Sequence, residues 1–467
     1  MDLFNTPVAD HVFHFIGVGG IGMSGLAEIL AKAGAVVSGS DIGSKTDFGR
    51  LELAGVTVFR QHNANNVPAS AIVVISTAIR DDNPELMAAR NRRQRIVHRS
   101  DILDEIMRNY KTVAVSGTHG KTSTTALVYT ALKAGGVSVG VINGGILEDI
   151  GTNAILPPHL HDWLIVEADE SDASFLKFSP DICIITNIEP EHMDTYGSED
   201  KLVTAFEQFA NRSALAVVCG DDPNTAIVAA RAETDIVTYG FGNDDEATYD
   251  SVASDARVKD GKMVFDAVVR GGVLDNVTVS LPGMHYVLNS LAALTIAQIA
   301  GADVMAAADG LAHFKGVGRR FSRVGTFHGA DVIDDYGHHP TEIATTLDAA
   351  RRVYTGKVVA VIQPHRFTRL RDLMDEFANC AKVADIAIVL PVYAAGEPPI
   401  DQVDHRVLAR NIDAVGMPED VFAVADEAGL FEILHDLELK KGDVIVCLGA
   451  GDITTMAAHL VAHAHHA

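Results

Sequence analysis

Short apolar runs alternate with longer amphipathic stretches along most of the chain. The run HFI at residues 14–16 leads into a glycine turn, an amphipathic stretch and the run AVVSGSD, which predicts strand, turn, helix and strand. Later runs end in charged, hydroxyl or glycine residues: AIVVIS, WLIVEADESD, DICIITNIEPEHMD, ALAVVCGDD, DVIDDYGHHP, KVVAVIQPHR, IAIVLPVYAAGE and VIVCLGAGD. Strands that alternate with helices predict parallel α/β sheets, whose ligands bind at the carboxyl ends of the strands.

One segment breaks this rhythm. Residues 248–281 show alternating polarity with Asp-Gly and Gly-Gly turns, which predicts a small antiparallel insertion, and a helix is expected at 287–299. A chain of 467 residues is long for one core, so about three domains are expected. We predict a Rossmann-like domain at 1–108, a central P-loop-type parallel sheet with the insertion at 109–317, and a second Rossmann-like domain at 318–467.

Composition and charge narrow the class of protein. The chain is 48% hydrophobic and 21% charged, has no apolar run of the ~18–20 residues that span a bilayer, and lacks a secretory signal at its start. Its four scattered cysteines form no metal or disulfide pattern, which indicates a reducing cytoplasm. The net charge of −25 argues against nucleic-acid binding, so an anionic ligand would need local arginines.

The first glycine turn carries the pattern Gly17-x-Gly19-x-x-Gly22. Such glycines let a pyrophosphate approach the start of a helix, and Asp41 follows where a ribose-binding acid would stand. The same pattern also occurs in turns that bind no ligand, and it does not distinguish NAD from other diphosphate ligands. We therefore predict a diphosphate site whose ligand the motif leaves open.

A second glycine turn, GTHGKTSTT at residues 117–125, joins an apolar run to a helix. The strict nucleotide-loop pattern has a glycine where Val115 stands. The strand–loop–helix context still predicts a phosphate site, with Lys121 on the β/γ-phosphates and Thr122 on Mg²⁺. We expect phosphate to be bound by the backbone N–H groups of four loop residues, Gly117, Thr118, His119 and Gly120.

Acidic clusters follow the next two apolar runs. The first contains Glu167, Asp169, Glu170 and Asp172, and the second contains Glu191, His192 and Asp194. Acidic loops are usually only solvated, but oxygen ligands with one imidazole, at adjacent strand ends beside a phosphate loop, favour Mg²⁺ or Mn²⁺. The pattern is typical of phosphoryl transfer.

The last third of the chain is rich in arginine and histidine at strand ends, with one tyrosine among them. These residues are Arg319, Arg320, Arg323, Tyr336, His338, His339, His365, Arg366, Arg369 and Arg371. Each could form a surface ion pair, but their density predicts a site for carboxylate or phosphate. The closing HAHHA is interpreted as a frayed helix end.

Taken together, the motifs resemble those of the Mur ligase family. They occur in family order across nearly the whole chain, as HFIGVGGIGMSGLAEIL, STAI, NPE, GTHGKTSTT, GTNA, EADESDASF, TNIEPEHMDTYG, LPGMHYVLNSLAA, GVGRRF, DDYGHHPTEI, QPHRFTRLRD, VYAAGE and GAGDI. The family loop is Gly-Thr-x-Gly-Lys-Thr, so Val115 is a family feature. The resemblance implies ATP-dependent joining of L-alanine to the lactyl carboxylate of UDP-N-acetylmuramate through an acyl phosphate, with two Mg²⁺ ions, in a monomer or weak homodimer.

The same resemblance implies residue roles. It implies catalytic roles for Lys121, Glu167, His192, His338 and Arg366, and metal ligands at Thr122, Glu167 and His192. It implies ATP contacts from Gly117, Thr118, His119, Gly120, Lys121, Thr122, Ser123, Asn289, Arg320 and Asp335. It implies substrate contacts from Gly17, Gly19, Gly20, Ile21, Gly22, Ser24, Asp41, Ser76, Thr77, Tyr336, His338, Arg366 and Arg369.

Two positions depart from the family pattern, and they leave alternatives to be tested. His285-Tyr286 replaces His-Asn at the adenine contact, and Glu191-His192 replaces Asp-His at the metal. No lysine follows Lys201 in the next helix, which fits the alanine-adding branch rather than relatives that use a carbamylated lysine. The alternatives are a ligase that adds a tripeptide to the same acceptor, a dehydrogenase, which would leave Lys121 without a role, and a non-catalytic nucleotide-binding scaffold.

Overall fold

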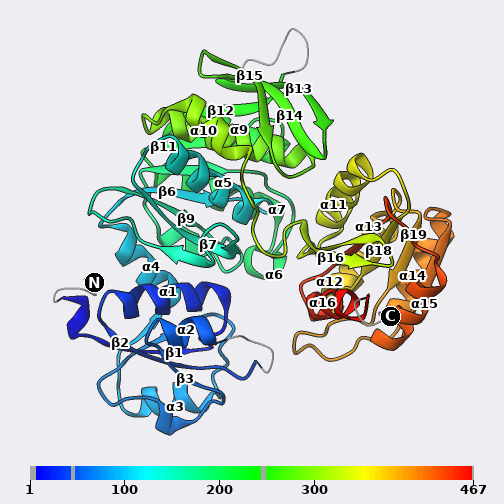
Figure 1. Cartoon of the computed structure of the whole chain (residues 1–467). Helices are drawn as coiled ribbons and strands as arrows, with labels where there is room; N and C mark the ends of the chain where they lie inside the picture. The colour runs from blue at the N-terminus through cyan, green and yellow to red at the C-terminus, as the bar shows by residue number, and fades with distance from the viewer. Residues whose placement is uncertain (1–6, 44–47, 243–248, 465–467) are drawn as a thin grey trace. The chain divides into compact units, whose positions relative to one another are not determined.

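The computed structural model describes residues 7–43, 48–242 and 249–464, and the chain divides into two compact units (Figure 1). The first unit comprises Met1–Ser254, Asp266–Asp275 and Leu288–Leu311, and the second comprises Asp255–Phe265, Asn276–Val287 and Ala312–Ala467. Within the described ranges the strands form three sheets.

The first sheet is parallel throughout and runs in the order β3-β2-β1-β4-β5. Its strands are β1 Val12–Ile16, β2 Val36–Ser40, β3 Thr57–Phe59, β4 Ile72–Ile75 and β5 Ile96–His98. The helices of this part are η1 Val8–Asp10, α1 Ile21–Lys32, α2 Gly49–Leu53, η2 Ala64–Asn66, α3 Pro84–Asn91 and α4 Arg99–Met107. The start of α3 is fixed locally, because the Asn83 side chain accepts from the first-turn N–H groups and Pro84 stands at the first helical position.

The second sheet runs in the order β15-β14-β13-β12-β11-β10-β6-β9-β7-β8. Its strands are β6 Lys111–Ser116, β7 Val139–Leu147, β8 Thr152–Ile155, β9 Trp163–Glu167, β10 Ile182–Ile185, β11 Leu215–Cys219, β12 Asp235–Phe241, β13 Ser251–Lys259, β14 Lys262–Val269 and β15 Gly272–Val279. The strand β6 pairs in parallel with β9 and β10, so the polar residues after these three strands share one edge of the sheet. Connections of two residues join β13, β14 and β15, which requires these strands to run antiparallel.

The helices that follow the strands of this part include the helix of the phosphate loop, α5. They are α5 Lys121–Ala134, η3 Ser174–Lys177, α6 Met193–Tyr196, α7 Glu199–Asn211, α8 Pro223–Arg231, α9 Met284–Ile299 and α10 Val304–Leu311. Residues of α5, such as Ala126 and Leu127, are fully buried, as expected for a helix that covers a parallel sheet.

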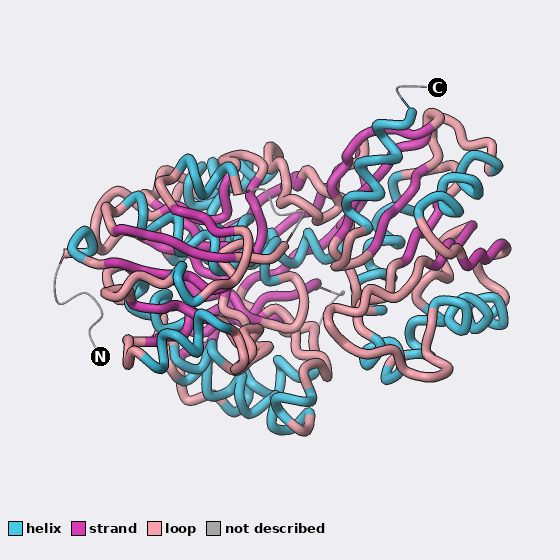
Figure 2. The backbone as a smooth tube through the Cα atoms, turned by 90° about the horizontal axis from the view of Figure 1, so that it is seen from below, coloured by secondary structure: helices cyan, strands magenta, loops and turns pink. Residues whose placement is uncertain are grey.

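The third sheet lies in the second unit and runs in the order β16-β17-β21-β18-β19-β20. Its strands are β16 Ser322–Phe327, β17 Ala330–Asp335, β18 Val358–Ile362, β19 Ile386–Val389, β20 Asp420–Ala423 and β21 Val444–Leu448. Its helices are α11 Pro340–Val353, α12 Phe367–Asp372, α13 Met374–Asn379, α14 His405–Val415, α15 Glu427–Asp436 and α16 Ile453–Ala464. Helices lie on both faces of this sheet (Figure 2). Along β18, Val358, Ala360 and Ile362 join one buried cluster while Val359 and Val361 join the other, which is the period of two that a doubly covered sheet requires.

The predicted fold class is confirmed. The strand expected at 71–76 is β4, and the helix expected at 287–299 begins three residues earlier, at Met284. The domain boundaries at 108 and 317 stay predictions. Of the predicted frayed end, residues 465–467 lie outside the described residues. A search of the described helices finds none with the length and apolarity needed to cross a bilayer.

Candidate active site

The first glycine turn connects β1 to α1 in the predicted strand–loop–helix context. Gly17 has a φ of +79°, which favours glycine, and the N–H groups of Gly17 and Val18 donate to the Ser40 carbonyl at the end of β2. The helix α1 begins after Gly20, which has no side chain to cap the first turn. The uncapped N–H groups of that turn form the kind of anion site that the motif predicts.

Asp41 makes hydrogen bonds to the glycine loop itself. Its Oδ2 accepts from the N–H of Gly19 at 2.8 Å and its Oδ1 accepts from the N–H of Gly43 at 2.8 Å. The carboxylate therefore holds the glycine loop in shape, and the contact with ribose that the sequence indicated stays a prediction. The sequence could not show this, because the 22-residue separation between Gly19 and Asp41 is closed only by the pairing of β1 with β2.

The second glycine turn is built at the carboxyl end of β6 and opens α5. Gly117 has a φ of +138°, and a Cβ placed on it would lie 2.0 Å from Thr186 Oγ1, so only glycine fits. Gly120 has a φ of +81° and is the N-cap residue of α5. Both glycines are required by the backbone of the loop, as the motif implied.

Two of the four loop amides expected to face phosphate are already bonded. The N–H of Thr118 donates to the Asn187 carbonyl at 2.9 Å, and the N–H of His119 donates to Asn187 Oδ1 at 2.8 Å. Thr186 Oγ1 in turn donates to the His119 carbonyl at 2.6 Å. For Thr118 and His119 the expectation of amides free for phosphate is therefore corrected: their N–H groups tie the loop to the residues that follow β10. Sequence reasoning gave Thr186 and Asn187 no role.

Lys121 lies folded onto its own loop and onto the acidic cluster. Its Nζ donates to the carbonyls of Gly117 and Thr118 at 2.6 and 2.9 Å, and lies 2.8 Å from Glu170 Oε2. Burial by itself would lower the pKa of Lys121, but the charges of Glu170 and Asp169 outweigh burial and raise this pKa. The lysine is therefore a fixed positive charge at the phosphate loop.

Glu170 is the carboxylate that the structure places closest to this charge. Its side chain is 1% exposed, and burial raises its pKa to about 7 against the opposing charge of Lys121. His192 Nε2 lies 3.7 Å from Glu170 Oε1. Glu170 thus links Lys121 to the histidine predicted to bind metal, a role that the cluster of acids in the sequence did not single out.

The predicted metal ligands supply hard oxygen donors. Glu167 Oε2 accepts from the N–H of Gly144 at 2.8 Å, while its Oε1 and the Thr122 hydroxyl have no hydrogen-bond partner among the described residues. His192 holds a left-handed backbone, with φ at +56°. Backbone strain of this kind concentrates at functional sites. A predicted ligand set of available carboxylate and hydroxyl oxygens with one imidazole fits Mg²⁺ better than Zn²⁺.

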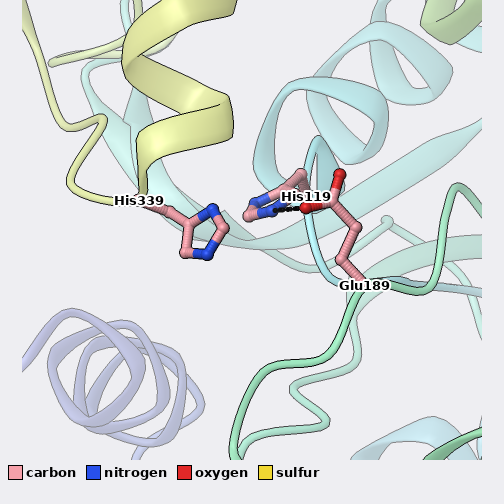
Figure 3. Close-up of side chains that lie close together, drawn as sticks. All are labelled: His119, Glu189 and His339. Atoms are coloured by element: carbon pink, nitrogen blue, oxygen red, sulfur yellow. Dashed lines mark ion pairs between the residues drawn. The ribbon is translucent and has the colours of Figure 1, made fainter. Parts of the chain in front are cut away.

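Other predicted residues of the first unit flank these groups. His119 Nε2 pairs with Glu189 Oε2 at 3.4 Å, as Figure 3 shows, which places Glu189 beside the loop. Asn289 on α9 is buried, and its Oδ1 would lie 3.4 Å from a Cβ on Gly120, so it faces the phosphate loop. Ser123 is buried in the first turn of α5. Beyond β4, the Thr77 hydroxyl donates to Asp172 at 3.4 Å, while the Ser76 hydroxyl has no hydrogen-bond partner within the described part of the chain.

The second unit brings its own predicted residues together after β17. Asp335 accepts from the N–H groups of Phe321 and Gly337, both at 2.7 Å, and burial raises its pKa although Arg320 opposes this. The guanidinium carbons of Arg319 and Arg320 lie 4.9 and 5.2 Å from the centre of the Tyr336 ring. These contacts hold two positive charges against the Tyr336 ring.

A cationic patch continues after β18. The His338 ring meets the rings of Tyr336 and His365 edge-on, at 5.2 and 5.5 Å. Burial, together with the nearby charges of His338, Arg369 and Arg366, lowers the pKa of His365 to about 3. The rings of Tyr336, His338 and His365 thus lie close together in the second unit, and their contact with substrate stays a prediction. Arg366 adopts a left-handed φ of +70° at the N-cap of α12. A neutral histidine among arginines suits an anionic ligand such as a carboxylate.

The phosphate loop connects a strand of a parallel sheet to a helix that begins with Gly-Lys-Thr, and a buried carboxylate lies beside it. This arrangement defines the class of nucleoside-triphosphate-binding α/β proteins. Three family models match the chain: "Mur ligase family, catalytic domain" at residues 12–111, "Mur ligase middle domain" at 115–297 and "Mur ligase, glutamate ligase domain" at 319–451. The chain belongs to the Mur ligase family and is an ATP-dependent ligase.

Individual relatives agree with this assignment. The chain is 44% identical over 461 residues to the UDP-N-acetylmuramate–L-alanine ligases of Chelativorans sp. (strain BNC1) and Mesorhizobium japonicum, in each case covering 97% of both chains. It superposes on the crystal structure of the UDP-N-acetylmuramate–alanine ligase of Thermotoga maritima with a TM-score of 0.83 at 29% identity, covering 98% of this chain and 99% of that one.

Proposed function

We propose that this chain joins L-alanine to the lactyl carboxylate of UDP-N-acetylmuramate, with cleavage of ATP to ADP and phosphate. The observation that carries the proposal is the buried Lys121–Glu170 pair at the phosphate loop, on the sheet edge that also presents Glu167 and His192. Two relatives 44% identical over nearly the whole chain are named for this reaction.

The chemistry proceeds in two balanced steps. A carboxylate oxygen of the acceptor attacks the γ-phosphorus, the bond from phosphorus to the ADP oxygen breaks, and ADP leaves. The amine of L-alanine then attacks the carbonyl carbon, loses a proton, and phosphate leaves as the carbon–oxygen bond breaks. ATP is consumed because a free carboxylate is a poor electrophile, whereas its acyl phosphate, a mixed anhydride, is a good one.

Different residues of this chain serve different parts of these two reaction steps. Lys121 supplies a fixed positive charge where charge develops on the transferred phosphoryl group. Thr122, Glu167 and His192 would hold Mg²⁺, which neutralises phosphate charge when bound. The cations after β17 and β18, among them Arg366 and His338, would hold the carboxylate of L-alanine. Asp335 and Arg320 would complete the nucleotide contacts.

The remaining assignments are part of the same proposal. The four cysteines are free and buried, which fits a reducing compartment and a cytoplasmic enzyme. The net charge of −25 disfavours nucleic-acid partners. We expect a monomer or a weak homodimer.

The deciding experiment is phosphate release from ATP and Mg²⁺ with UDP-N-acetylmuramate, measured with no amine, with L-alanine, and with L-alanyl-D-glutamyl-diaminopimelate. Release that needs both the sugar nucleotide and L-alanine supports the proposal. Release with the tripeptide alone would assign the chain to tripeptide addition. No release in any arm would favour the non-catalytic scaffold.

A further inference from the structure

We propose that Arg99 binds the diphosphate of the sugar nucleotide at the start of α1. This inference rests on the proposed function and extends it to a residue to which neither the motifs nor the comparisons assign a role. Arg99 is the first residue of α4, which follows β5. It therefore stands at the carboxyl edge of the first sheet, the edge at which such sheets bind ligands.

The guanidinium of Arg99 lies against the glycine turn. A Cβ placed on Gly22 would lie 3.2 Å from Arg99 Nη1 and 3.8 Å from its Cζ. Gly22 is in the first turn of α1, whose N-cap residue Gly20 has no capping side chain. The missing side chain at Gly22 thus gives the arginine access to the uncapped end of α1.

Most donors of Arg99 are available. Nη2 donates to Asp169 Oδ2 at 2.8 Å, and Arg99 makes no other side-chain hydrogen bond with the residues that the structure describes. An arginine carries five N–H donors in a planar fork, so Nη1 and Nε keep theirs. Its side chain is 20% exposed, so a ligand at the loop can reach it.

The position is electrostatically unusual for a cation. The start of a helix carries a partial positive charge, so an arginine there is disfavoured unless an anion is also present. Asp169 supplies one carboxylate, which accepts from Nη2 alone. A diphosphate at the same helix end would supply the missing negative charge.

The glycine turn itself cannot balance a diphosphate. Residues 17–22, GVGGIG, contain no lysine or arginine, and the whole chain has a net charge of −25. Arginine is the side chain whose planar fork matches phosphate oxygens in pairs. The structure therefore combines backbone N–H groups from α1 with one arginine fork from α4 around the same ligand group.

Binding of UDP and of uridine to the full-length protein tests this role by isothermal titration calorimetry. Arg99→Met should weaken UDP binding about 10–100-fold, from the loss of charge-assisted hydrogen bonds, and should leave uridine binding unchanged because uridine has no phosphate. Arg108→Met is the matched control, since Arg108 lies just beyond the same helix and pairs with Asp104. It should bind both ligands like the wild type.

Asp169→Asn separates ligand binding from a structural ion pair. If Arg99 acts on the diphosphate, this variant should keep UDP affinity or raise it, because the arginine loses a competing carboxylate. An equal loss of UDP affinity in Asp169→Asn and Arg99→Met would overturn the inference. If Arg99→Met also loses uridine binding, the variant is misfolded and Arg99→Lys decides the question. Weaker UDP binding with unchanged uridine binding in Arg99→Lys supports the role of Arg99, and unchanged UDP binding overturns it.

The failure of the inference and that of the proposed function are distinguishable. If the wild type binds UDP-N-acetylmuramate and Arg99→Met binds UDP as tightly as the wild type does, only the role of Arg99 is overturned. Wild-type protein that binds neither UDP nor UDP-N-acetylmuramate overturns both.

Discussion

Lys121 Nζ lies 2.8 Å from Glu170 Oε2, and the two side chains are 15% and 1% exposed. This pair joins the phosphate loop to the acidic cluster that follows β9, and His192 Nε2 lies 3.7 Å from the same carboxylate. A buried lysine without a carboxylate partner would be expected to lose its proton, so Glu170 keeps the loop charged before any nucleotide binds.

Replacing this lysine should separate chemistry from sugar-nucleotide binding. Lys121→Ala should lower kcat by about 10²–10³-fold or more, because the transferred phosphoryl group loses a preorganised charge. The affinity for UDP-N-acetylmuramate should stay near that of the wild type, since its predicted loop belongs to the first sheet. Phosphate-release kinetics and calorimetry measure the two effects, with Lys133→Ala in the last turn of α5 as control. A parallel loss of both functions would contradict the assignment.

Gly144 should prove necessary for the metal site. Its N–H donates to Glu167, and a Cβ at this position would lie 2.4–2.6 Å from the carboxylate atoms of Glu167. Gly144→Ala should displace this carboxylate and raise the Mg²⁺ concentration for half-maximal activity about 10-fold or more, with weaker Mg²⁺-dependent ATP binding by calorimetry. Gly429→Ala is the control, because a Cβ there meets ordinary contacts only. Unchanged Mg²⁺ dependence would remove Glu167 from the metal site.

Glu85 should make stability depend on acid pH. Burial alone would raise its pKa, but hydrogen bonds from His14, Ser40, Asn66 and the N–H of Asn63 outweigh burial and lower it from 4.5 to about 2. The folded state therefore favours the ionised form. The stabilisation that ionised Glu85 gives the folded state is complete above about pH 4.5 and is lost as the pH falls towards 2.

The comparison of wild type with Glu85→Gln isolates this group from the other carboxylates. At pH 7 the variant should be less stable by about 2–3 kcal/mol, since bonds to a charged acceptor are replaced by neutral ones. The difference in unfolding free energy should shrink as the pH falls from 4.5 towards 2, as measured by urea denaturation. A difference that stays constant across this range would show that Glu85 does not titrate with folding.

Arg366 should set the affinity for the amino acid. Arg366→Lys keeps the charge but loses the planar fork, so the KM for L-alanine should rise about 10–100-fold while the KM values for ATP and UDP-N-acetylmuramate change little. Arg371→Lys in the same helix is the control, because Arg371 pairs with the neighbouring Asp372 at the surface. An equal rise in all three KM values would indicate damage to the fold instead.

Some of the site could be read from the sequence because it is local. Gly117, Gly120 and Lys121 lie within five residues, and their spacing encodes a turn that only glycine tolerates and a lysine in the first turn of a helix. The alternation of strands and helices likewise encodes the fold class, because each period depends only on near neighbours.

Contacts between distant segments needed the tertiary structure. Three features of the site depend on which strands lie side by side. These features are the contact of Asp41 with the glycine loop, the bonding of the Thr118 and His119 N–H groups to Asn187, and the pairing of Lys121 with Glu170 rather than with another acid. Strand order arises from long-range packing that no spacing in the chain records. The sequence thus determined which side chains follow each strand, because that order is local, and the pairing of the strands decided which of these side chains meet.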